Sequence, residues 1–418
     1  NKLVLVSSGL GNSSIAFGTV SYGSNGVLEY QGASAQTTAN AEFPSAGGPP
    51  TVIINNLHGV MLHASRTILT ALDLQQGEFS IGSNTLTLNG AVNQTSGTWA
   101  GGAGSNLVMA ATGPSTNLPA IELNNLTINR TNDIGLAGNI TVHGTVSITS
   151  GSLNANGFQV KYEPGAALRY NGTTEQTAGN AEFPTNHGPT ALIIENPTQL
   201  NLHANRTISG TIHLQNGVFS IGNFTLNLIG FFQQNAGTLS SGASGHLVFE
   251  ENNLPSILPS ATILANLTVN RSGGVTMAGT ATVNNNLNLS NGDFLIGSNL
   301  LTINGSITKT LGALVGGDFS SITFGGSGTP TGLHEITLHS LTINRPQGIN
   351  MLGNVTVKHA LNLMSGPFSI GSNTMFINGS INVLTGNLLG GANSTPVSYT
   401  HLRAHETVLD LVCRLLLE

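Results

Sequence analysis

The amino-acid sequence predicts an all-β fold in which short strands wind into a parallel β-helix of about 16 coils. Three observations lead to this prediction. Long sequence blocks recur in register, apolar and polar residues alternate with the period of a strand, and charged residues make up only 7% of the 418-residue chain. Each observation restricts the fold in a different way.

Internal repeats divide most of the chain into related units. The segment YQGASAQTTANAEFP at residues 30–44 returns 140 residues later as YNGTTEQTAGNAEFP at residues 170–184. A shorter block recurs as NLTINR, NLTVNR and SLTINR, ending at Arg130, Arg271 and Arg345. Repeats that stay in register over this length indicate duplication, and they predict a repeat architecture.

The pattern inside one block predicts strands. In GEFSIGSNTLTLNG, Phe79 and Ile81 alternate with polar residues before a turn, and Leu86 and Leu88 do so after it. A period of 2 is typical of strands with one buried face. Gly, Asn and Ser separate the strands because they tolerate the backbone conformations of tight turns. We therefore expect these four apolar side chains to point into a shared interior.

Short strands and duplicated units leave a sandwich, a propeller or a β-solenoid as architectures. A propeller blade takes about 40 to 50 residues, whereas these units of roughly 65 to 76 residues divide better into three coils of roughly 22 to 25 residues. Low charge content is expected in a β-helix, because like charges would stack directly on successive coils. We predict one β-helix over residues 1–395, with duplicated units at about 22–161, 162–300 and 301–395.

Composition restricts the function classes. The 39% of apolar residues and the net charge of −6 predict a folded chain rather than a disordered one. The 12 basic residues are scattered singly, which predicts no nucleic-acid interface. No apolar run reaches the roughly 18 to 20 residues that cross a bilayer, so we expect no membrane span. Residue 1 is Asn and no leader-like segment opens the chain, so we expect a fragment or mature form.

A family resemblance rests on the segments NLTINR, GNITVHGTVSITSGSL, GSNTLTLNG and YNGTTEQTAGNAEFP. They resemble the repeats of large bacterial surface proteins exported by type IX secretion, over about residues 1–395. Those proteins resemble right-handed parallel β-helices of the pectin-lyase-like and adhesin type. The resemblance implies an extracellular or outer-surface location. Such proteins usually end in a β-sandwich sorting domain, which is not visible in this sequence.

Enzymatic chemistry is not predicted. Hydrolysis of a glycosidic bond needs two convergent carboxylates, and lyase chemistry needs a basic Arg or Lys that often lies beside acidic calcium ligands. Four aspartates precede the tail, and none is paired: Asp73, Asp133, Asp293 and Asp318. Glu250 and Glu251 are adjacent, but consecutive residues of a strand point to opposite faces. We therefore predict no catalytic residue, no cofactor and no metal site.

The candidate ligand-contact residues are Phe43, Phe183, Arg66 and Arg206. The two phenylalanines lie in AEFP segments that interrupt the strand rhythm with Pro and Gly, as binding loops do. Their rings are hypothesised to stack on a sugar, and the alternative is that they fill the core beside their loops.

Five arginines follow Asn or Ser in nearly the same context: Arg66, Arg130, Arg206, Arg271 and Arg345. One hypothesis is a basic stripe for an acidic polysaccharide. The favoured alternative is a structural corner residue that hydrogen-bonds exposed carbonyls between coils. His63 and His203 are interpreted as turn or surface residues, because no metal-ligand spacing surrounds them.

The TLTL motif at residues 85–88 raises an ice-binding hypothesis, which requires a Thr array on nearly every coil. The corresponding positions of the other repeats are Asn227, Thr302 and Phe376. We therefore predict a broken array.

The tail at residues 396–418 differs from everything before it. It contains no Gly or Asn and carries the only cysteine, Cys413. Its segment PVSYTHLRAHET resembles the translation of a transposase-type sequencing adapter, so we expect a non-native tail. The alternative is a helix that caps the open end of the solenoid.

Together these observations predict a non-catalytic cell-surface or secreted stalk or adhesin-like protein. Its expected partners are polysaccharide or extracellular matrix, with no nucleic acid and no membrane span. The alternative is a fragment of a carbohydrate-active β-helix enzyme of the lyase or hydrolase kind.

Overall fold

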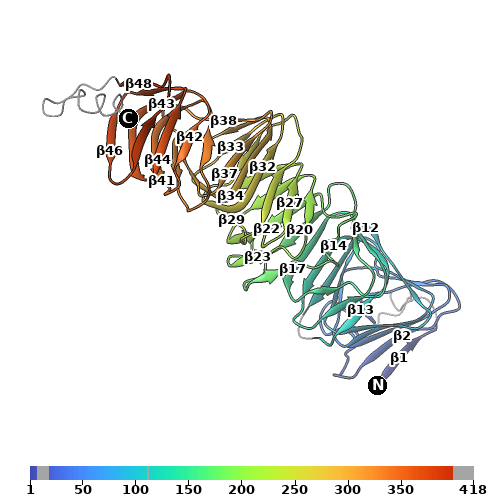
Figure 1. The fold of residues 1–418 in the computed structure, drawn as a ribbon. Helices are drawn as coiled ribbons and strands as arrows, with labels where there is room; N and C mark the ends of the chain where they lie inside the picture. The colour runs from blue at the N-terminus through green and yellow to red at the C-terminus, as the bar shows by residue number, and fades with distance from the viewer. Residues whose placement is uncertain (7–17, 111–112, 399–418) are drawn as a thin grey trace. The chain divides into compact units, whose positions relative to one another are not determined.

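A computed structural model describes residues 1–6, 18–110 and 113–398, and these residues form strands and turns without a helix. The parallel strands stack as a β-solenoid of about 18 turns, which confirms the predicted fold class (Figure 1). The number of turns exceeds the expected 16 because a turn is shorter than expected. Thr342 and Asn362, which pair on neighbouring turns, are 20 residues apart. The described part of the chain offers no apolar helix of bilayer-spanning length.

Two compact units make up the chain. Unit 1 comprises Asn1–His203 and Thr211–Gly217, and unit 2 comprises Ala204–Gly210 and Val218–Glu418. The strands of unit 1 are β1 (Lys2–Leu5), β2 (Val27–Tyr30), β3 (Gln36–Thr37), β4 (Thr51–Asn55), β5 (Val60–Met61), β6 (Arg66–Ile68), β7 (Ala71–Gln76), β8 (Glu78–Ser80), β9 (Thr85–Leu88), β10 (Ala91–Gln94), β11 (Thr98–Ala100), β12 (Gly102–Ala110), β13 (Thr116–Leu118), β14 (Ile121–Asn129), β15 (Ile134–Leu136), β16 (Ile140–Val142), β17 (Thr145–Ser150), β18 (Leu153–Asn154), β19 (Val160–Tyr162), β20 (Ala167–Tyr170), β21 (Gln176–Thr177), β22 (Ala191–Ile194), β23 (Gln199–Asn201) and β25 (Thr211–Leu214). Strand β6 pairs with β9.

The strands of unit 2 are β24 (Arg206–Ile208), β26 (Val218–Ser220), β27 (Thr225–Leu228), β28 (Phe231–Gln234), β29 (Thr238–Ser240), β30 (His246–Phe249), β31 (Ser256–Leu258), β32 (Thr262–Asn270), β33 (Val275–Met277), β34 (Ala281–Asn291), β35 (Asp293–Leu295), β36 (Leu300–Ile303), β37 (Ser306–Lys309), β38 (Ala313–Val315), β39 (Ser321–Phe324), β40 (Thr331–Leu333), β41 (Ile336–Asn344), β42 (Ile349–Met351), β43 (Val355–Ser365), β44 (Pro367–Gly371), β45 (Thr374–Ile377), β46 (Ser380–Val383), β47 (Asn387–Gly390) and β48 (Thr395–Ser398). The expected non-native tail thus enters β48 with its first three residues, and residues 399–418 lie outside the described residues.

Apolar columns fill the interior of unit 1. Leu86 of β9 pairs with Leu107 of β12, which pairs with Leu126 of β14, and Val146 and Leu168 continue the column on β17 and β20. All five side chains are completely buried. Burying a Leu or Val side chain contributes roughly 1.5 to 3 kcal/mol, so such columns are the main stabilising feature of the fold.

The strand prediction for residues 77–90 is confirmed. Phe79, Ile81, Leu86 and Leu88 are all completely buried. The intervening Thr85 and Thr87 alternate with them and are partly exposed. Alternation in the sequence therefore identified the buried face correctly.

The recurrent GSN sequence forms a corner of the solenoid. Gly82 has a positive φ of 60°, a conformation that glycine adopts without steric penalty. The side-chain amide of Asn84 then donates to the carbonyl oxygens of Leu62 and Ile81, at 2.9 and 3.0 Å. Asn299 and Asn373 repeat this pair of hydrogen bonds in unit 2. The asparagines therefore join one turn to the turn before it.

Arg130 connects three consecutive turns of unit 1. Its guanidinium donates to the carbonyl oxygens of Leu88 at 2.7 Å, Gly90 at 3.0 Å and Pro114 at 3.2 Å. The side chain is only 1% exposed. The expectation that these arginines bind carbonyls is met, but the carbonyls lie inside the solenoid rather than at an exposed corner. Buried carbonyls need a donor, and the guanidinium supplies several at once.

The same arrangement recurs in unit 2. Arg271 is completely buried and donates to the carbonyl oxygens of Leu254 at 2.7 Å and Ile229 at 3.0 Å. Arg345 is 1% exposed and donates to those of Thr329 at 2.7 Å and Gly305 at 2.8 Å. These arginines therefore tie turns together and are not available to a ligand on the surface.

Replacing Arg130 by Ala should destabilise the protein strongly. The change leaves several buried carbonyl oxygens without a donor, and we expect a loss of about 2 to 4 kcal/mol in the free energy of unfolding. Urea unfolding followed by far-ultraviolet circular dichroism measures this loss. Arg169→Ala is the control, because Arg169 forms a partly exposed ion pair with Glu195 and such pairs contribute at most about 1 kcal/mol. Equal urea midpoints for the two variants would contradict the structural role of Arg130.

Candidate functional site

The AEFP segment of unit 1 brings two sequence-predicted candidates together. The Arg66 guanidinium lies 5.8 Å from the centre of the Phe43 ring, and its Nε donates to the Phe43 carbonyl oxygen. Phe43 is completely buried and Arg66 is 5% exposed. The two side chains therefore contact each other inside the protein.

Glu42 organises the same segment from within. Its carboxylate accepts hydrogen bonds from the Ala39 backbone amide at 2.6 Å and from the Tyr30 hydroxyl at 3.2 Å. The Tyr22 hydroxyl donates to the Glu42 carbonyl oxygen at 2.6 Å. Burial, followed by the charge of Glu42, raises the pKa of both tyrosines. The phenols therefore remain protonated and act as donors.

The second AEFP segment repeats this arrangement. The Glu182 carboxylate accepts from the Gly179 amide at 2.6 Å and from the Tyr170 hydroxyl at 3.0 Å. Phe183 is 1% exposed, and Arg206 is 4% exposed and donates to the Asn205 carbonyl oxygen at 2.7 Å. Burial of all four candidate ligand-contact residues favours the alternative interpretation, in which the phenylalanines fill the core and the arginines bind carbonyls.

His63 completes the polar cluster in a defined protonation state. Its Nε2 lies 2.7 Å from Nη2 of Arg66, and its Nδ1 lies 2.6 Å from the Thr38 hydroxyl. Nε2 also lies 3.1 Å from Oδ1 of Asn40. A guanidinium only donates, so the contact with Arg66 favours the neutral tautomer that carries its proton on Nδ1. Burial, and then the charge of Arg66, lower the pKa of His63. The cluster therefore holds a neutral histidine.

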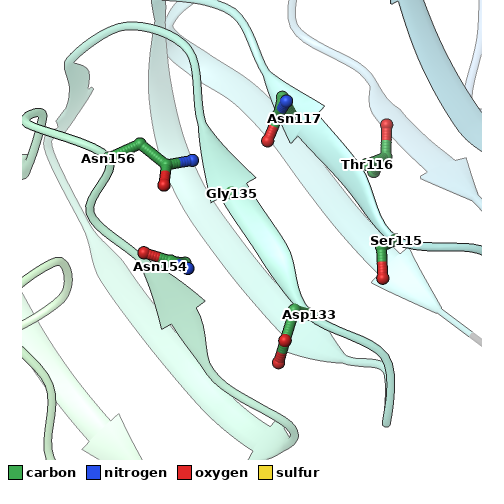
Figure 2. Close-up of a pocket in the computed structure, with 7 residues that line it drawn as sticks. All are labelled: Ser115, Thr116, Asn117, Asp133, Gly135, Asn154 and Asn156. Atoms are coloured by element: carbon green, nitrogen blue, oxygen red, sulfur yellow. The ribbon is translucent and has the colours of Figure 1, made fainter.

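A polar pocket with a volume of about 240 Å³ lies on unit 1 (Figure 2). It lies over the three-stranded sheet of β13, β15 and β18, in which Asn117 pairs with Gly135 and Gly135 pairs with Asn154. The pocket is lined by Ser115, Thr116, Asn117, Asp133, Gly135, Asn154 and Asn156. Three successive turns thus contribute side chains to one surface.

Gly135 opens the floor of this pocket. A Cβ atom at this position would lie 2.0 Å from Oδ1 of Asn117 and 2.6 Å from Nδ2 of Asn156, so a larger residue would displace these two amides. Figure 2 shows the two asparagines on opposite sides of Gly135. Asn156 holds its place with a positive φ of 48°, which asparagine tolerates better than most residues. An amide acceptor and an amide donor therefore converge above the glycine.

The pocket suits a neutral ligand that is rich in hydroxyl groups. Its amides and hydroxyls both donate and accept hydrogen bonds, and Asp133 supplies its one charged group. In the described residues, His, Cys, Asp and Glu side chains form no group of three that could hold a metal ion. The lining groups of the pocket can exchange hydrogen bonds with a ligand.

Sequence analysis did not identify this pocket. Asp133 was noted only as an unpaired carboxylate, and the asparagines were not distinguished from the many others in the chain. The pocket depends on the register of three turns and on the missing side chain of Gly135 between two amides. Repeat comparison alone does not reveal this register.

The fold defines the protein as a β-solenoid with a polar surface pocket. No protein-family model, curated protein or solved structure matches the chain.

Stability should decrease in mild acid, and His63 should account for part of the decrease. Because its folded-state pKa is lowered, His63 stays neutral at a pH where the unfolded chain binds a proton. The stabilising contribution is complete above the ordinary histidine pKa of about 6.5 and is lost as the pH falls below it. His63→Gln should reduce the difference in urea midpoint between about pH 7.5 and about pH 5.

His58→Gln is the matched control for this experiment. His58 lies in the same unit, its side chain is exposed, and its backbone amide donates to Asn56. We expect this variant to keep the wild-type pH dependence. An unchanged pH dependence in His63→Gln would contradict the assigned role of His63.

Proposed function

We propose that this protein is a non-catalytic, cell-surface or secreted adhesin-like scaffold that binds polysaccharide. The observation that carries the proposal is the pocket in which Asn117 and Asn156 converge above Gly135. Sugar hydroxyls both donate and accept hydrogen bonds, and side-chain amides can satisfy both functions. A few convergent polar groups in a concave site are typical of ligand recognition.

The composition of the pocket supports binding without cleavage. A glycoside hydrolase places two carboxyl groups about 5 to 9.5 Å apart across the scissile bond. Asp133 is the one carboxylate that lines this pocket. Asp133 is suited to accept hydrogen bonds from a sugar. The lining has no second carboxylate, so it cannot provide both a general acid and a general base or nucleophile.

The solenoid supports a scaffold role. Strands stacked in register and turns joined by buried arginines form a rigid surface, on which exposed residues are held at fixed spacing. A rigid scaffold reduces the entropy that is lost when a ligand binds.

Replacing Asn117 by Ala should weaken polysaccharide binding by about fivefold to tenfold, because one amide hydrogen bond is lost. Asn156→Gly should have a similar effect while it retains the positive φ. A glycan array probed with the full chain measures binding. Asn93→Ala is the control, because Asn93 is an exposed asparagine of unit 1 outside the pocket.

The same assay separates binding from catalysis. We expect bound glycans to be retained without release of reducing or unsaturated sugars. Sugar release by the wild type that Asp133→Asn abolishes would overturn the non-catalytic proposal. Wild-type binding in both pocket variants would overturn the assignment of the pocket.

A further inference from the structure

Unit 2 carries an exposed strip of aromatic rings at one corner. The rings of Phe319 and His339 are stacked with centroids 6.4 Å apart, and those of His339 and His359 with centroids 4.6 Å apart. Phe319 is 72% exposed, whereas Phe249 and Phe324 of the same unit are completely buried. We call Phe319, His339 and His359 the aromatic strip.

The two stacked histidines lie at a β-bulge. The pairing of β41 with β43 shifts in register between Leu338 and Ser340, and His339 lies at this shift. Bulges re-aim side chains and occur frequently beside functional sites. Nδ1 of His339 lies 3.0 Å from the Asp318 carbonyl oxygen. A carbonyl only accepts, so Nδ1 carries the proton, and Nε2 is left with a lone pair for a donor.

A face of small polar residues adjoins the aromatic strip. Thr323 pairs with Thr342, Thr342 with Asn362 and Asn362 with Asn382, on β39, β41, β43 and β46. Nδ2 of Asn362 donates to the Thr342 hydroxyl at 3.0 Å, and Nδ2 of Asn382 donates to Oδ1 of Asn362 at 2.8 Å. These bonds order the polar groups along the axis. We call this set the polar face.

The charges beside the strip balance. Nζ of Lys358 lies 3.9 Å from the Asp318 carboxylate, and both side chains are substantially exposed. The pair adds no net charge, so the surface favours a neutral ligand over an acidic or a basic one. Each group can also exchange part of this weak ion pair for a ligand hydroxyl.

We propose that the aromatic strip and the polar face together form a second carbohydrate-binding site, specific for neutral hexose rings of a polysaccharide. The apolar C–H face of a sugar packs on Phe319, and the sugar hydroxyls bond to the polar face and to Nε2 of His339. Aromatic rings with a polar surround supply both the contact area and the orientation. The inference rests on the proposed polysaccharide-binding function, but it concerns residues of unit 2 alone.

The test uses the full chain and four neutral probes built from hexose rings: cellohexaose, laminarihexaose, chitohexaose and mannohexaose. Isothermal titration calorimetry should show one or more of them binding, and about tenfold weaker binding by Phe319→Ala and His359→Ala. Phe158→Ala is the matched control, because Phe158 is a partly exposed phenylalanine of unit 1 outside both sites. Phe319 is exposed, so its removal should leave the urea midpoint unchanged. In addition, the ring proton signals of His339 and His359 should shift in NMR spectra when the bound probe is added.

The outcomes separate this inference from the proposed function. If only the Asn117 and Asn156 variants lose binding, the second site is overturned and the pocket is supported as the binding site. Loss in the Phe319 and His359 variants alone would support the second site and overturn the pocket assignment. Failure of all four probes to bind the wild type would overturn both. A wild-type dimer that Phe319→Ala dissociates in sedimentation experiments would identify the strip as an interface between copies and overturn the carbohydrate site.

Discussion

Each residue of this fold is constrained by the residue one turn before it and one turn after it, because neighbouring parallel strands lie about 4.8 Å apart. The internal arginines show how strict this constraint is. A Cβ on the glycine one turn after each arginine would lie within 2.0 Å of the arginine carbonyl oxygen. The pairs are Arg130 with Gly151, Arg271 with Gly292 and Arg345 with Gly366. The arginine blocks and the glycine blocks therefore recur together, because the backbone of each arginine leaves no space for a side chain on the next turn.

The sequence predicted the buried side of the strands but not the contacts between turns. Alternation identified Leu86 and Leu88 as interior residues, since period 2 is a property of one strand. Which residues become neighbours depends on the length of each turn. Ala71 pairs with Ala91, 20 residues later, whereas Val27 pairs with Thr51, 24 residues later. The Thr array illustrates the consequence. Comparison between repeats predicted a broken array, and Thr87 does pair with Val108 in unit 1. The short run in which Thr282, Thr302 and Thr323 pair on successive turns of unit 2 was not predicted.

The candidate sites could not be predicted for the same physical reason. Asn117 and Asn156 converge only because Gly135 lies between them on the intervening turn. His339 and His359 stack where the pairing of β41 with β43 shifts in register, and this shift is not visible in the sequence. Conversely, Phe43 and Arg66 look like ligand-contact residues in the sequence, but they satisfy the backbone and core of their own segment. Residues that recur in the sequence repeats proved to be structural. The candidate binding residues lie at positions that the repeats do not share.

Two shallow sites on one chain suit a polymeric ligand. Each site offers a few hydrogen bonds or one ring contact, so each should bind a single sugar weakly. A polysaccharide presents the same ring many times, and a chain long enough to reach both sites binds the second intramolecularly. Avidity then exceeds the affinity of either site without any additional contact. Within each proposed site, strands paired in register hold the binding groups in place, so these groups do not have to be ordered again at each encounter.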